Sequence, residues 1–161
     1  MKAKRSILTV AVLASAIGLT AIGVHSTATA VPNNAGRIEG SWRITAQVPD
    51  GAGGTTTAYA LATFSYDGGI VETPQEKFAL SNGHGAWENL GNRYYDSRVV
   101  YFRHDDLGVV VGLTEARAQV RVNPSGHWFS GRFRLYTSDI GGKLEKAGVD
   151  GLVTGERITV E

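Results

Sequence analysis

Apolar and polar residues alternate with a period of two through most of the chain after Gly36. In RIEGSWRITAQV, residues 37–48, the even positions are apolar or small and the odd positions are polar. Because successive side chains of a strand point to opposite faces, this pattern predicts a strand with one buried and one solvated face. No window of about ten residues has a helical period, so we expect an all-β protein.

Turn-forming residues divide this pattern into about eight strands. Asp67-Gly68 is a tight-hairpin signal, and Asn123-Pro124-Ser125-Gly126 is a strong turn signal. Residues 75–83 are the least regular part and are consistent with either one helical turn or a loop. The expected strands are 37–48, 55–66, 69–74, 84–90, 93–104, 109–122, 127–137 and 143–161.

Eight sequential antiparallel strands hide their edges most simply by closing into an up-and-down barrel, in which the first and last strands pair. A sandwich of two sheets is the alternative. The short, sequential connections favour the barrel, because a Greek-key sandwich needs at least one long crossing connection.

The first 30 residues have the pattern of a secretory signal peptide. Lys2, Lys4 and Arg5 precede an apolar run, and Ala28-Thr29-Ala30 has the small-x-small form of a cleavage site. A membrane anchor is the alternative, but polar residues follow the run and no basic flank does. We therefore expect a signal peptide over 1–30, a single domain over 31–161, and a secreted or periplasmic location.

Charge and cysteine content narrow the function classes. Three of the 16 Lys and Arg residues and none of the 15 Asp and Glu residues precede Val31, so the predicted domain is slightly acidic. It has no basic run, which disfavours a nucleic-acid partner because phosphates are neutralised by clustered cations. The chain has no cysteine, which excludes disulfides, thiolate nucleophiles and cysteine metal sites.

Many positions in the apolar phase are small, which leaves the barrel interior either filled by aromatic residues or hollow. An eight-stranded barrel is about the size at which both outcomes occur. The same aromatic residues are therefore either ordinary core or the wall of a pocket for a small apolar molecule. These candidate ligand-binding residues are Trp42, Phe64, Tyr66, Trp87, Tyr95, Tyr101, Phe129 and Phe133.

Gly40-Ser41-Trp42 near the start of the pattern and Gly155-Glu156-Arg157 near its end resemble the G-x-W motif and terminal basic residue of the calycin superfamily. The chain is most similar in layout to small exported bacterial proteins of lipocalin-like type, with allene-oxide-cyclase-like barrels as a near alternative. The resemblance implies a closed barrel, an apolar ligand and structural roles for Gly40, Trp42 and Arg157. If the first and last strands meet, Arg157 can lie over the Trp42 indole in a cation–π contact.

This resemblance does not supply a reaction. The usual lipocalin loop motif, with an acidic residue ahead of an aromatic residue and arginine, has no good counterpart, and the disulfide common in those proteins cannot form. G-x-S-x-G, Walker A and dinucleotide motifs are also absent. His84, His104 and His127 have no zinc-ligand spacing, so we expect no metal and no cofactor.

An enzyme in this fold would use acid/base or shape-driven chemistry inside the barrel. The candidates are His84, Glu88, Tyr95 and Glu115. In HGAWENL, His84 and Trp87 fall on opposite faces, so Trp87 is the expected core residue and His84 faces the barrel interior only if a bulge at Gly85 turns it inward. Three hypotheses follow: a binder of a small apolar molecule, a cofactor-free cyclase or isomerase, and a protein-binding or inhibitor module with exposed loops at 51–54 and 75–83.

Overall fold

The computed structural model describes residues 36–50, 53–75 and 79–160, all of which lie within one compact unit, Val31–Glu161. The predicted signal peptide lies outside the described residues, as do parts of the loops at 51–54 and 75–83. Within the described part, no helix is long and apolar enough to cross a membrane.

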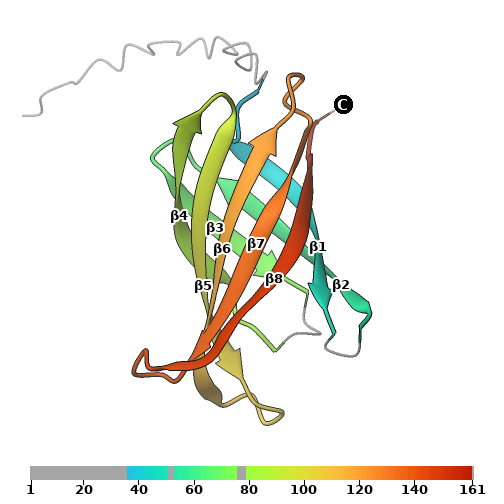
Figure 1. Ribbon diagram of the computed structural model, residues 1–161. Coiled ribbons are helices and arrows are strands. Elements are labelled where there is room, and N and C mark those ends of the chain that lie inside the picture. Colours follow the sequence, from blue (N-terminus) through green and yellow to red (C-terminus); the bar gives the residue numbers. More distant parts are fainter. Residues whose placement is uncertain (1–35, 51–52, 76–78, 161) are drawn as a thin grey trace, which may run out of the picture. The chain divides into compact units, whose positions relative to one another are not determined.

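Eight antiparallel strands form a closed barrel in which every strand pairs with its neighbours in sequence (Figure 1). The predicted all-β, up-and-down architecture is confirmed, and the strand bounds fall within a few residues of those expected. The strands are β1 Gly40–Pro49, β2 Thr55–Phe64, β3 Gly69–Pro74, β4 Gly83–Gly91, β5 Tyr94–His104, β6 Val110–Val122, β7 Trp128–Ser138 and β8 Leu144–Arg157.

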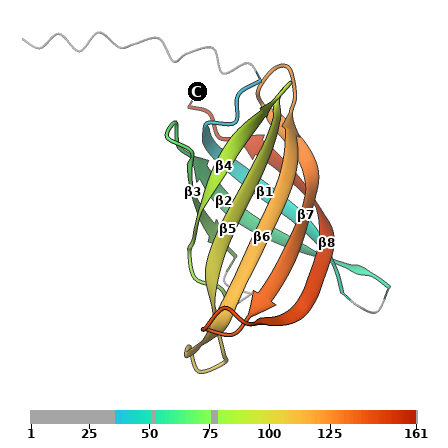
Figure 2. The same ribbon diagram turned by 60° about the vertical axis from the view of Figure 1, so that its left-hand side comes forward.

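Closure of the barrel comes from pairing between β1 and β8, so the sandwich alternative does not form. Trp42 lies opposite Arg157 and Gln47 lies opposite Leu152 at the two ends of this antiparallel ladder. Figure 2 shows β1 lying between β2 and β8. Because the sheet closes on itself, no strand of the barrel is left as an open edge.

The two ends of the barrel differ in their connections. We call the end that carries the start of β1, the end of β8 and the turns after β2, β4 and β6 the closed end, and the opposite end the far end. At the closed end, the Ser65–Gly69 turn confirms the predicted hairpin, with Gly68 N–H donating to the Ser65 carbonyl. At the far end, Asp105 accepts hydrogen bonds from the Leu107 and Val109 amides, which fixes the β5–β6 turn.

The hydrophobic core fills the interior toward the closed end. Ile38 and Trp42 have 0% of their surface exposed, and the Trp42 and Phe129 rings pack with centroids 4.9 Å apart. Phe64 approaches Phe129 edge-on. The alternating pattern of the sequence therefore places the apolar side chains of the core on the inner side of the barrel wall and most charged side chains on the outer side.

Candidate functional site

Arg157 closes one end of the barrel by covering the core and binding the chain that leads into it. Its guanidinium carbon lies 4.2 Å from the Trp42 ring centroid. The same guanidinium donates hydrogen bonds to the carbonyls of Arg37, Glu39 and Gly126. One buried cation thus joins the segment before β1, the β6–β7 turn and β8. The predicted cation–π contact between Arg157 and Trp42 is confirmed.

Two further contacts complete this closure. The Trp42 indole N–H donates to the Ile38 carbonyl over 2.7 Å, and the Tyr95 hydroxyl donates to the Gly36 carbonyl over 3.1 Å. Gly40 has φ +115°, and a Cβ there would lie 2.7 Å from an Arg157 nitrogen. The glycine of G-x-W is therefore required both by its backbone conformation and by the approach of Arg157.

On β1 and β2, the solvent accessibility of the inward-facing residues rises from the closed end to the far end. Along β1, Trp42 and Ile44 are buried, whereas Ala46 and Val48 are partly exposed although they point the same way. Along β2 the order reverses with the strand direction, because Ala60 is partly exposed and Ala62 is buried. Ala46 and Val48 on β1 and Ala60 on β2 thus remain accessible to solvent in the part of the interior nearest the far end.

We call this part the far-end interior. It combines small and medium apolar side chains with side chains that carry a polar group. Its residues are Ala46, Ala60, Glu72, Tyr101, Thr114 and Leu135.

A carboxyl and a phenol meet in the far-end interior. Glu72 on β3 pairs across the sheet with Gly83 on β4, and a Cβ at Gly83 would lie 2.4 Å from the Tyr101 ring. The Tyr101 ring on β5 therefore lies across the bare backbone of β4 and brings its hydroxyl to the Glu72 carboxyl, to which it hydrogen-bonds. Only glycine at position 83 leaves room for this contact.

Burial controls the ionisation of this pair. Desolvation raises the pKa of Glu72 above its ordinary value, and the Tyr101 hydrogen bond opposes this rise only in part. Desolvation also raises the pKa of Tyr101, to which the Glu72 charge and hydrogen bond add. Tyr101 is 3% exposed, and Thr114, its neighbour on β6, is 6% exposed. Burial thus favours the neutral forms of both the Glu72 carboxyl and the Tyr101 hydroxyl.

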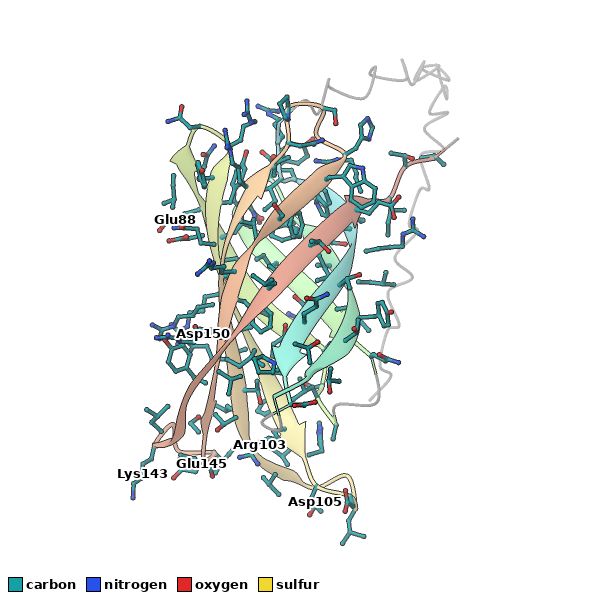
Figure 3. All side chains as sticks on the ribbon, turned by 45° about the vertical axis from the view of Figure 1, so that its right-hand side comes forward. Glu88, Arg103, Asp105, Lys143, Glu145 and Asp150 are labelled. Atoms are coloured by element: carbon teal, nitrogen blue, oxygen red, sulfur yellow. The ribbon has the colours of Figure 1, made fainter. Side chains whose placement is uncertain are left out.

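Arg103 lies two residues beyond Tyr101 on the same inward phase of β5. Its guanidinium lies over Gly112 and forms an ion pair with Glu145 at the start of β8, at the far end (Figure 3). Its Nε atom is buried without a hydrogen-bond partner among the described residues. The edge of the far-end interior therefore has an ion-paired guanidinium with one unused donor.

The predicted acid/base candidates lie elsewhere. His84 and Glu88 are exposed on the outer face of β4, and Figure 3 shows Glu88 pointing away from the barrel. Glu115 is also on the outer face, where burial favours its neutral form but hydrogen bonds from Arg98 and Arg117 lower its pKa overall. The structure does not bring these three residues into the interior, and no bulge at Gly85 turns His84 inward.

Tyr95 is the fourth candidate and points inward, but at the closed end. Desolvation and the nearby Glu39 charge raise the pKa of its hydroxyl, and its hydrogen bond goes to the backbone at Gly36. Its ring packs edge-on against Trp87, with centroids 5.7 Å apart. Tyr95 thus holds the closed end together and has no contact with the far-end interior that would give it a role in acid/base chemistry.

The aromatic residues predicted to bind a ligand separate into three groups. Tyr101 is part of the buried core and is the one among them that extends toward the far-end interior. Tyr66 is 69% exposed in the β2–β3 turn and does not line the interior. The remaining six pack within or against the core: Trp42, Phe64, Trp87, Tyr95, Phe129 and Phe133.

Sequence reasoning missed Glu72 and Arg103. In GIVETP, Glu72 shares its phase with Ile70, which is buried, so the alternation already placed one carboxylate on the inward face. Val71 and Thr73 offer an equally apolar opposite phase, and this ambiguity concealed the signal. A charged residue in the buried phase of a strand is the feature that would have identified it.

The outer wall carries two open grooves of different character. One crosses β4 to β8 and is lined by charged side chains, among them Arg98, Arg117 and Arg134. The other crosses β3, β2, β1, β8 and β7 beside the exposed side chains of Tyr59, Leu61 and Trp128. Both lie outside the barrel, so neither is the interior site that the sequence predicts.

Among the described residues, no three His, Asp or Glu side chains gather in an arrangement suited to a metal ion. Comparison with protein-family models, with curated proteins and with solved structures finds no match for this chain.

Proposed function

We propose that this protein binds a small, largely apolar molecule in the far-end interior of its barrel. The observation that carries the proposal is the rise in accessibility of the inward-facing side chains, from buried Ile44 to partly exposed Ala46 and Val48 on one strand. A closed end sealed by Arg157 and a far end lined by small apolar residues together form a one-ended container.

The calycin superfamily is the structural family we propose for the chain. The closed eight-stranded barrel is consistent with it, and the contact between Trp42 and Arg157 supports it. We also propose that the protein acts after export to the periplasm or the medium. The supporting features are the signal-like first 30 residues and the lack of cysteine.

Native mass spectrometry of the purified chain after incubation with an apolar cell extract tests the binding proposal. We expect a retained small molecule that is lost from Ala60→Trp, because the added indole fills the far-end interior. Leu61→Trp is the matched control, since Leu61 is the next residue on β2 and points outward. Failure of the wild-type chain to retain any molecule, or equal retention by both variants, would contradict the proposal.

A cyclase or isomerase acting on an apolar substrate is the second candidate function. Glu72 and Tyr101 favour it, because a neutral carboxyl within an apolar interior can donate a proton to a bound substrate and recover it. Incubation with the same extract, followed by mass spectrometry over time, should reveal a compound that the wild type consumes and Glu72→Gln only binds. If the wild type consumes nothing that it retains, the protein is a binder only.

A protein-binding or inhibitor function is the third candidate. Its structural support is the exposed cluster of Tyr59, Leu61 and Trp128 beside an outer groove. In a cross-linking experiment with an extracellular protein fraction, Trp128→Ser should lose a partner that Ala60→Trp keeps. A partner lost by neither variant would place the interface elsewhere.

A further inference from the structure

We propose that Glu72 and Tyr101 are the polar end of the binding site and that they receive a hydrogen-bond-accepting oxygen, such as a carbonyl, of an otherwise apolar ligand. This inference rests on the proposed binding function and adds the chemical class of the ligand. It starts from the one carboxyl group that the described residues place in the far-end interior.

The geometry decides which groups are used and which remain for a ligand. Tyr101 reaches Glu72 across Gly83 and donates its hydroxyl proton to a carboxyl oxygen. A protonated carboxyl still has its own O–H to donate after it has accepted this bond. Tyr101 on β5 and Thr114, its partner on β6, are almost fully buried. Bulk water therefore does not compete freely for the carboxyl O–H of Glu72.

The surroundings favour an acceptor oxygen over a cationic group. Desolvation favours the neutral form of Glu72, which offers a donor and carries no charge for an ammonium group to pair with. Arg103, two residues from Tyr101 in the same inward phase, pairs with Glu145 and keeps a buried Nε–H that lacks a partner in the described part of the chain. The neutral Glu72 carboxyl and the unpaired Arg103 Nε–H are both donors, so both favour an acceptor oxygen.

The apolar remainder of the ligand follows from the other residues of the site. Ala46, Ala60 and Leu135 present methyl groups, and Thr114 adds a hydroxyl group. A ligand with one acceptor oxygen and an apolar body therefore matches the lining, whereas a ligand with many hydroxyl groups would leave them unpaired.

Two probes of nearly equal size test the inference: 2-acetylnaphthalene, which has a carbonyl, and 2-ethylnaphthalene, which has none. We expect the wild-type chain to bind the carbonyl probe about threefold to tenfold more tightly, as one hydrogen bond provides. This preference should decrease as pH rises and Glu72 ionises, because the carboxylate then repels the carbonyl oxygen. Isotope-edited infrared spectra should show the bound carbonyl stretch shifted to lower frequency.

Two variants of one residue serve as matched controls. Glu72→Gln keeps a neutral donor, so it should retain the carbonyl preference and lose its pH dependence. Glu72→Leu should bind both probes equally and lose the infrared shift. Thr73→Leu, on the outer face of the same strand, should behave as wild type.

The outcomes separate this inference from the proposed function. If wild type binds both probes with equal affinity, the barrel is a binder but Glu72 does not select a carbonyl. Tighter binding of 2-(aminomethyl)naphthalene at higher pH would overturn the inference in favour of a cationic ligand. If none of the probes binds, both the inference and the proposed interior site fail for molecules of this size.

Discussion

At the scale of single residues, Arg157 joins the segment before β1 to the β6–β7 turn at the closed end. Replacing it with lysine keeps the charge but removes the planar fork that serves the Arg37, Glu39 and Gly126 carbonyls. We expect Arg157→Lys to lower the free energy of unfolding by about 2 to 4 kcal/mol, because buried carbonyls lose their donors. Urea unfolding of the two chains measures this difference.

The control for this variant is Arg121→Lys. Arg121 is exposed, and its guanidinium carbon lies 5.1 Å from the Tyr94 ring centroid. A solvent-exposed cation–π contact contributes under about 1 kcal/mol, so this change should have little effect on unfolding. Equal losses in the two variants would show that the Arg157 carbonyl contacts do not stabilise the barrel.

Gly83 is the residue on which the Glu72–Tyr101 contact depends. A Cβ at this position would lie 2.4 Å from the Tyr101 ring and 2.6 Å from a Val99 methyl. We expect Gly83→Ala to destabilise the barrel by about 1 to 3 kcal/mol and Gly83→Ala with Tyr101→Leu to recover part of that loss. Gly141→Ala, in an exposed turn with no such neighbour, should be nearly neutral. Thermal unfolding of the four chains provides the comparison.

At the scale of the strands, barrel closure has a direct consequence for hydrogen exchange. The β1–β8 ladder runs from Trp42 opposite Arg157 to Gln47 opposite Leu152. We therefore expect the amides of Arg43 and Thr45, which face Glu156 and Thr154 across this ladder, to exchange as slowly as those in the middle of β6. Exchange in β1 and β8 at the rate of open sheet edges would show that the barrel does not stay closed in solution.

The strands are also the level at which sequence reasoning succeeded. Strict alternation in residues 37–48 and clear turn residues elsewhere determine both the existence and the phase of most strands, and G-x-W with Arg157 indicates how the ends meet. In β3 the pattern is ambiguous, because Ile70 and Val71 are both apolar. The Glu72–Tyr101 contact depends in addition on register across β4, which no local pattern contains.

His84 and Trp87 also show what alternation predicts and what it does not. Alternation correctly placed them on opposite faces of one strand, with Trp87 packed against the core and its indole N–H donating to the Ser65 carbonyl over 3.0 Å. It did not show which part of the interior would be filled. That depends on how the large residues of several strands meet, and here they meet at the closed end.

At the scale of the whole molecule, Glu72 links stability to pH. The pKa of Glu72 is raised on folding from a usual value of about 4.5, so above that pH the folded chain holds more protons than the unfolded chain. The free energy of unfolding should therefore fall as pH rises from about 4.5 to the folded-state pKa. Glu72→Gln lacks this decrease, so its stability relative to wild type should grow over the same window and then level off.

Urea unfolding at a series of pH values measures this effect, and Glu115→Gln is the control. The arginine partners of Glu115 lower its pKa. Glu115 therefore stabilises the folded chain above about pH 4.5, and this stabilisation is lost as pH falls through the lowered pKa. The two variants should thus differ from wild type in opposite directions above pH 4.5. Parallel stability curves for wild type and Glu72→Gln would show that Glu72 is not desolvated.

The most direct test of the account is the position of a bound apolar molecule. With methyl-labelled protein and saturating 2-acetylnaphthalene, nuclear Overhauser effects report which methyl groups contact the probe. We predict contacts from the probe to Ala46, Ala60 and Leu135 in the far-end interior. Contacts to the outward methyl groups of Leu61 or Leu152, or no contacts to any protein methyl group, would contradict an interior binding site.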